Sequence, residues 1–320
     1  MKNYKIFVHY LKTFIFLIII ICILKNSESA FNYAYSGLTQ WALKMVPTLF
    51  PFMMISSIMV YCGADIELGK ILTIFFKKIF LYSNYGLYAV FMGFLCGFPM
   101  GAKVVCELYK NNKINKNEAQ LLIGFCNNIG PSYFIGIIIP ILYDNGIKNI
   151  YPFLFGMYGI PMLYGIILSY FFVSRNRYDT IQYLNILNKD NSENTLKISA
   201  ILKKSCFENT QSLILLGGYI TFTNAFRIVL NYVPLNGDYK IIASCFIEII
   251  SGIQSVNMIM IDNNTKIFWI MTALCFGGIS CILQTGCFLE DCGLSILNYL
   301  KHKFVITIIS ALYYYLILFY

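Results

Sequence analysis

The stretch GFPMGAK at residues 97–103 determines how the chain is expected to fold. A second stretch, FCNNIGPS at residues 125–132, follows about one helix later, and both lie inside strongly apolar sequence. Glycine, proline and asparagine interrupt helices and leave backbone polar groups unpaired. In hydrocarbon such a break persists only where it is buried in protein or lines a wet cavity. Two neighbouring breaks therefore predict a site.

The second half of the chain repeats this arrangement, with EIISG at residues 248–252 and FGGIS at residues 276–280. Paired interruptions at corresponding places in two halves are typical of secondary transporters built from inverted repeats, whose binding site lies near the bilayer midplane. The pattern predicts two re-entrant helical hairpins and two broken transmembrane helices.

The composition sets the class of protein. The 320 residues are 58% hydrophobic and 12% charged, where a soluble domain carries about 25% charged residues. We therefore expect an all-α polytopic membrane protein. Its net charge of +9 is assigned to cytoplasmic loops, which collect Lys and Arg, and not to a nucleic-acid partner. Eleven cysteines without a CxxC pair, and only two histidines, indicate buried free thiols and no metal site.

The expected organisation has four parts. Residues 1–36 form an N-terminal transmembrane helix whose N-terminus is cytoplasmic. Residues 37–173 form the first repeat, with a span, a re-entrant hairpin at 86–111, a broken helix at 116–143 and a second span. Residues 174–205 are a cytoplasmic linker. Residues 206–320 form the second repeat, with a span, a hairpin at 241–261, a broken helix at 266–287, a short amphipathic piece and a final span from Phe304.

The two motifs of the first half resemble those of the YlbJ (SpoVV) family of sporulation integral membrane proteins, within the nucleoside-recognition or Gate-domain membrane proteins. The Gate fold is similar to concentrative nucleoside transporters, which hold their solute between two opposed hairpins and two broken helices. By that resemblance, residues 248–252 correspond to the second hairpin tip and 276–280 to the second break. The Gln-Thr-Glu signature of those transporters is replaced here by Phe98-Pro99-Met100, which argues against a nucleoside solute.

The resemblance also implies a biological setting. The YlbJ branch is held to move dipicolinate across the outer, mother-cell-derived forespore membrane during endospore formation. This implies a multi-pass protein of that membrane that transports a small anionic solute. The expected partners are the lipid bilayer and the solute, and a homo-oligomer is left open. No cofactor is expected, and a coupling ion, Na⁺ or H⁺, is left open.

Fourteen residues at the breaks form the candidate solute-binding site: Gly97, Pro99, Gly101, Lys103, Asn127, Asn128, Gly130, Ser132, Glu248, Ser251, Gly252, Gly278, Ser280 and Gln284. They were chosen because glycines permit close backbone approach, because polar groups at a break can bind a solute, and because a cation at membrane depth is a functional hypothesis by default.

Each charged or polar member of this set also has a plainer interpretation. Lys103 can pair with Glu107 four residues on, and the two asparagines can cap the broken ends of their own helix. Glu248 can bind a cation or proton, or can pair with Arg227. Ser280 and Gln284 lie one turn apart and can complete the cavity or join helices by hydrogen bonds.

Three classes of function remain to be compared. A transporter of a small anionic solute is the preferred one, with a nucleoside or other small solute as the alternative. A non-transporting structural protein of the sporulation membrane is the third class. An enzyme is not expected, because the sequence holds no Ser-His-Asp, paired-carboxylate or phosphate-loop arrangement.

Overall fold

The computed structural model describes residues 2–76, 79–171 and 197–320. Every regular element in these ranges is a helix. Six helical runs are long and apolar enough to cross a membrane: Ser27–Cys62, Lys116–Asp144, Tyr151–Phe171, Ile198–Tyr232, Asn263–Cys292 and Ile296–Phe319. The chain is an all-α polytopic membrane protein, as predicted from its composition.

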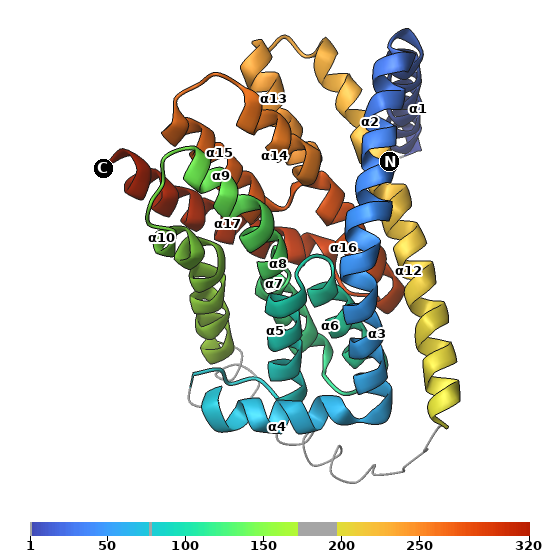
Figure 1. Ribbon diagram of the computed structural model, residues 1–320. Helices are drawn as coiled ribbons and strands as arrows, with labels where there is room; N and C mark the ends of the chain where they lie inside the picture. The colour runs from blue at the N-terminus through green and yellow to red at the C-terminus, as the bar shows by residue number, and fades with distance from the viewer. Residues whose placement is uncertain (1, 77–78, 172–196) are drawn as a thin grey trace.

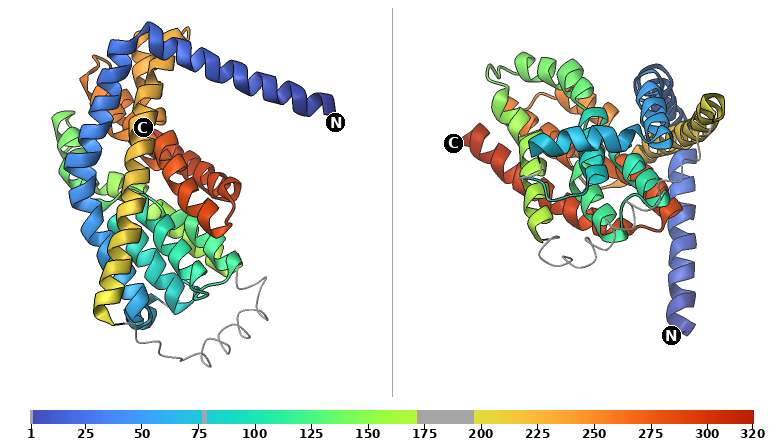
Figure 2. Two further views of the ribbon diagram at one scale, coloured as in Figure 1. Left: turned by 90° about the vertical axis from the view of Figure 1, so that its right-hand side faces the viewer. Right: turned by 90° about the horizontal axis from the view of Figure 1, so that it is seen from below.

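The N-terminal helices divide at a different place from the one expected. Helix α1 (Lys2–Lys25) projects away from the bundle (Figure 2) and ends just before Asn26. Helix α2 (Ser27–Gln40) then runs through a π-helical turn into α3 (Val46–Cys62) without a break. The first helix therefore ends before Asn26 and not at the predicted residue 36, because one helical run continues from Ser27 to the C-cap at Gly63.

The first hairpin and the first broken helix follow α4 (Ala64–Phe76), which lies across the lower end of the molecule in Figure 1. Helices α5 (Asn84–Cys96) and α6 (Met100–Lys110) form the hairpin, and residues 97–99 turn the chain between them. Helix α7 (Lys116–Cys126) stops before four non-helical residues, and α8 (Pro131–Tyr133) resumes the run that ends with α9 (Ile139–Asp144). These elements agree with the predicted break.

The helices of the second half begin with α12 (Ile198–Phe226), which extends into a 3₁₀ turn, Arg227–Tyr232. The predicted linker, 174–205, lies outside the described residues up to 196, and from Ile198 it is already helix α12. Helices α13 (Gly237–Ile247) and α14 (Ile249–Met258) form the second hairpin, and α15 (Asn263–Phe276) and α16 (Gly278–Cys292) the second broken helix.

The last helix, α17 (Ile296–Phe319), is one continuous helix. The expected short amphipathic piece before residue 304 is wrong, because the buried face continues through that point from Tyr299 to Leu318. Ser295 caps the start of the helix by accepting a hydrogen bond from the Asn298 amide at 3.3 Å. Residues before Phe304 therefore belong to the interior of the bundle.

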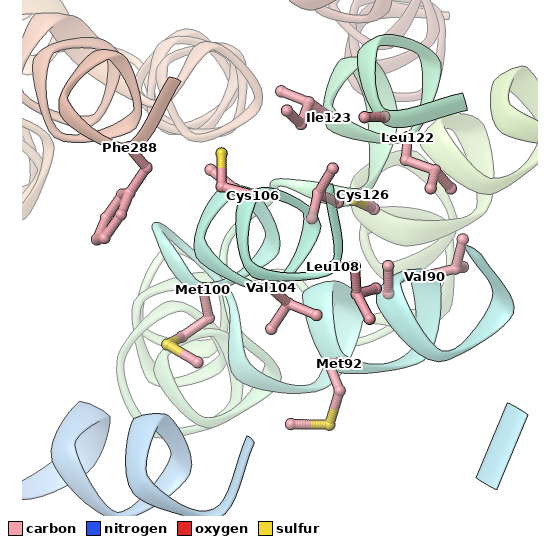
Figure 3. Packing of buried hydrophobic residues seen from close by; sticks show 14 of the residues in the cluster. Val90, Met92, Met100, Val104, Cys106, Leu108, Leu122, Ile123, Cys126 and Phe288 are labelled. Carbon is pink, nitrogen blue, oxygen red and sulfur yellow. The ribbon is translucent and has the colours of Figure 1, made fainter. Parts of the chain in front are cut away.

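The two hairpins occupy opposite ends of the molecule. In Figure 1, α5 and α6 lie in the lower half and α13 and α14 in the upper half, while α12 runs beside α2 and α3 along the whole bundle. Figure 3 shows the packing of apolar side chains where α5, α6 and α7 meet near α16: Val90, Met92, Met100, Val104, Cys106, Leu108, Leu122, Ile123, Cys126 and Phe288.

Close packing, and not transfer out of water, holds such helices together, because lipid tails are as apolar as the side chains. Glycines supply the close approach. A Cβ atom at Gly93 would lie 2.3 Å from the Cys126 carbonyl oxygen, and one at Gly101 would lie 2.6 Å from it. Both arms of the first hairpin thus contact the end of α7 through backbone.

Candidate functional site

One cavity joins both hairpins and both broken helices. Its volume is about 90 Å³, well below the roughly 300 Å³ at which pockets for drug-sized ligands begin. Its lining comes from the start of α3, the tip of each hairpin and the residues after each break: Met45, Thr48, Leu49, Phe52, Cys96, Phe98, Ile129, Gly130, Ser132, Tyr133, Glu248, Ile249, Ile250, Ser280, Cys281 and Gln284.

The tip of the first hairpin contacts the first break backbone to backbone. Gly97 has φ +82° and ψ −171°, a conformation open essentially to glycine alone. A Cβ atom there would lie 2.3 Å from the Gly130 nitrogen. Pro99 ends the turn as the N-cap of α6, and Gly101 lies in the first turn of that helix. These residues shape the hairpin, and of this tip the side chains of Cys96 and Phe98 face the cavity.

The tip of the second hairpin lies at Glu248, the first residue of the predicted tip at 248–252. The Glu248 carboxylate caps α14 by accepting hydrogen bonds from the amides of Ile250 (3.2 Å) and Ser251 (2.8 Å), so the helix restarts before those two residues. Gly252 instead packs inside the hairpin, where a Cβ atom would lie 2.5 Å from the Cys245 Cα.

Arg227 reaches the second hairpin without pairing directly with Glu248. Its guanidinium donates to the hydroxyls of Ser251 (2.8 Å), Ser244 (3.3 Å) and Ser255 (3.3 Å). The Ser251 hydroxyl in turn contacts the Glu248 carboxylate. The predicted interaction between the two charges is therefore relayed through one serine, and the negative charge of Glu248 is largely satisfied by this hairpin.

The second break places two polar side chains of α16 on the cavity. Gly277 (φ +86°) and Gly278 (φ +73°) turn the chain, and α16 starts there with no side-chain cap. Ser280 and Gln284 follow one turn apart, and they are 1% and 2% exposed. Within the described part of the chain, Gln284 Oε1 and the hydroxyl of Tyr133 have no hydrogen-bond partner. Each such buried group costs about 1–3 kcal/mol unless something binds it.

Lys103 lies away from this cavity. Its ammonium donates to Ser57 Oγ at 2.7 Å and forms an ion pair with Glu107, while Ser57 also contacts Asn209 of α12. The pairing at i plus 4 is the plainer of its two predicted interpretations. Lys103 lines a second, polar cavity of about 400 Å³ between α6, α12 and the end of α16, together with Tyr61, Lys110, Lys204, Glu208 and Asp291.

Asn127 and Asn128 occupy the first break and bind a residue that the sequence reasoning missed. Lys303 of α17 donates to the Asn127 carbonyl oxygen at 3.1 Å and to Asn128 Oδ1 at 3.2 Å. The side-chain amide of Asn127 donates to Thr285 Oγ1 at 2.8 Å. A helix ends at a negative dipole, so the ammonium stabilises the broken end of α7. The Asn128 side-chain amide also donates to the Phe125 carbonyl oxygen at 2.5 Å and so caps the end of α7, with Lys303 as a further donor at this break.

A sequence signal for Lys303 did exist. Lys303 belongs to the basic cluster Lys301-His302-Lys303, which is typical of a membrane surface. For that reason the expected final span began after it, at Phe304. Yet Tyr299, Lys303 and Ile306 are spaced as one face of a helix. Extending α17 backward by that spacing would have predicted a buried lysine.

Of the fourteen predicted residues, five line the cavity directly: Gly130, Ser132, Glu248, Ser280 and Gln284. Most of the others support it from the hairpins and breaks: Gly97, Pro99, Gly101, Asn127, Asn128, Ser251, Gly252 and Gly278. Lys103 belongs to the second cavity. The site so built offers apolar walls, unpartnered polar groups and an uncapped helix start, which together suit a small polar or anionic molecule.

The comparisons with known proteins bear on the family. No family model matches the chain, and no solved structure matches it. The sporulation integral membrane protein YlbJ of Bacillus subtilis (strain 168) is 23% identical over 230 residues, which cover 69% of this chain and 56% of that protein. The match thus spans little more than half the length of the relative. The chain is therefore similar to a sporulation integral membrane protein, the resemblance that its two motifs predicted.

Proposed function

We propose that this protein is a membrane transporter of a small anionic solute that acts in endospore formation, with dipicolinate as the first candidate. One observation carries the proposal: two half-length hairpins and two broken helices bring their interruptions together around one cavity. Irregular backbone at membrane depth persists only where it is buried in protein or lines a cavity, and here both breaks contribute residues to one cavity. The name of the YlbJ relative supplies the sporulation setting.

The cavity is built for binding more than for holding helices together. Polar groups that serve only as interhelical contacts find partners, whereas Gln284 Oε1 and the Tyr133 hydroxyl have none within the described residues. The cavity is also too narrow for a drug-sized solute as it stands. The contact between Gly97 and Gly130 is made by backbone and holds no side chains, so this contact itself can open without moving a side chain.

A helix start at the cavity favours an anion, although the one charged side chain in the lining is a carboxylate. Glu248 is the one carboxylate among its lining residues, and the hairpin's own donors already bind it. The start of α16, with no side-chain cap, directs the positive end of its dipole toward the same space. Phe52 and Phe98 contribute flat apolar walls, which suit an aromatic ring that carries carboxylates.

Flux into proteoliposomes tests this function directly. Liposomes containing purified protein should take up labelled dipicolinate, and should not take up uridine. Gly101→Leu should abolish uptake, because the new side chain meets the Cys126 carbonyl, whereas Gly218→Ala, with open space around its Cβ, should leave it unchanged. Imposed Na⁺ and pH gradients identify a coupling ion. Uptake of uridine alone would favour the nucleoside alternative, and no uptake of any compound would favour a structural protein.

A further inference from the structure

Lys303 is an unusual residue for a membrane interior. It is 1% exposed, and its two hydrogen-bond acceptors, the Asn127 carbonyl and Asn128 Oδ1, are neutral. The ion pairs found across the described ranges do not include it. A buried cation without a counter-ion is expensive in a bilayer and points to a function by default.

Two other buried cations near the hairpins, Lys103 and Arg227, are neutralised nearby. Lys103 pairs with Glu107. Arg227 is linked to Glu248 through Ser251. Lys303 differs from both, because its neighbours supply only dipoles and one aromatic face.

The aromatic ring that contacts Lys303 also lines the cavity, whereas Lys303 itself does not. The ammonium nitrogen lies 4.5 Å from the centre of the Phe98 ring, a cation–π contact. Phe98 stands at the tip of the first hairpin, against Gly277 of the second break, where a Cβ atom would lie 2.8 Å from the ring. A movement of the hairpin tip would therefore uncover the ammonium toward the cavity.

We propose that Lys303 is the counter-ion for a carboxylate of the transported solute, and that Phe98 is the movable cover between them. This rests on the function proposed above and deepens it. In the closed arrangement the asparagines of the first break and the Phe98 ring hold the ammonium. With solute bound, the ring moves aside and a carboxylate takes its place, so that the charge is paired only when the site is filled.

Binding by purified protein in detergent tests the counter-ion, with dipicolinate and its neutral isostere 2,6-pyridinedicarboxamide as probes. The wild type should prefer dipicolinate. Lys303→Gln, whose amide can still donate to both asparagine oxygens, should bind dipicolinate about tenfold or more weakly, the loss expected for one charge-assisted hydrogen bond. Its binding of the diamide should stay unchanged. Lys303→Arg should keep part of the preference.

The matched control is Lys266→Gln, since Lys266 is also a buried lysine on a predicted span, at the start of α15, but does not line the cavity. It should bind both probes as the wild type does. If Lys303→Gln retains the wild-type preference for dipicolinate, the counter-ion role is refuted while the transport proposal stands. If the wild type binds neither probe, dipicolinate is refuted as the solute, and the counter-ion role that depends on it is refuted as well.

Chemical modification tests the cover separately and needs no solute. Reductive methylation with formaldehyde, quantified on the peptide that contains Lys303, should be slow in the wild type. Phe98→Ala should make it several-fold faster, and Phe91→Ala, at a ring of α5 that does not line this cavity, should not. An unchanged rate in Phe98→Ala would contradict the role of the ring.

Discussion

Replacing Gly97 with alanine tests the contact on which the site depends, the meeting of the first hairpin tip with the first break. Two costs add. Alanine must adopt φ +82° and ψ −171°, a conformation that costs a non-glycine residue of order 1–3 kcal/mol. Its Cβ would also lie 2.3 Å from the Gly130 nitrogen, and such overpacking costs about 1–3 kcal/mol. We expect a loss of about 2–6 kcal/mol in the free energy of unfolding.

The assay is unfolding of the purified protein in mixed detergent micelles, with Gly218→Ala as the matched control. No atom lies within 4 Å of a Cβ built at Gly218, and in a helix interior alanine is favoured over glycine by up to about 1 kcal/mol. The control should therefore be neutral or slightly stabilising. If Gly97→Ala unfolds within about 0.5 kcal/mol of that control, the usual range for changes away from packed features, the tip does not meet the break as described.

Three further substitutions probe single contacts. Gln284→Leu removes a buried oxygen that has no hydrogen-bond partner among the described residues. Thermal unfolding should therefore show equal or higher stability, by about 1 kcal/mol, while uptake into liposomes falls. Reduced stability with normal uptake would mean that Gln284 has a structural role. Glu107→Gln leaves Lys103 buried without its counter-ion and should lower the free energy of unfolding by about 3 kcal/mol. In a double-mutant cycle, adding Lys103→Met should restore most of that stability. Additive losses from the two substitutions would speak against the pair. Asp65→Asn breaks the 2.7 Å ion pair with Lys113. Because the Lys113 side chain left behind is partly exposed, the loss of unfolding free energy should be smaller than for Glu107→Gln. An equal or larger loss would contradict this reasoning.

The interruptions could be predicted from the sequence because their chemistry is local. Gly97 and Pro99 end one helix and start another whatever surrounds them, and Gly277 does so in the second half. The same holds for the predicted break after Cys126, where the four non-helical residues are Asn127, Asn128, Ile129 and Gly130. Short-range backbone preference decides such positions.

The orientation of charged side chains could not be predicted in the same way. Lys103 was expected in the cavity, yet the face of α6 that carries it is turned toward α3 and its Ser57 hydroxyl. Within residues 248–252 the turn falls at Glu248 because its carboxylate caps the helix that follows, a detail that the pattern of glycine and serine does not reveal. Lys303 was missed because its burial depends on helices far away in sequence. These are properties of tertiary packing.

One further consequence follows from the long helix α12. In its first half, Asn209 is hydrogen-bonded to Ser57 of α3, which in turn contacts Lys103 of the first hairpin. Near its end, Asn224 is bonded to Ser251 of the second hairpin, with 2.7 Å between the oxygens. About 22 Å of rigid helix separates the two asparagines. A tilt of α12 would therefore act on both hairpins at once, on the first through Ser57 and on the second directly through Ser251.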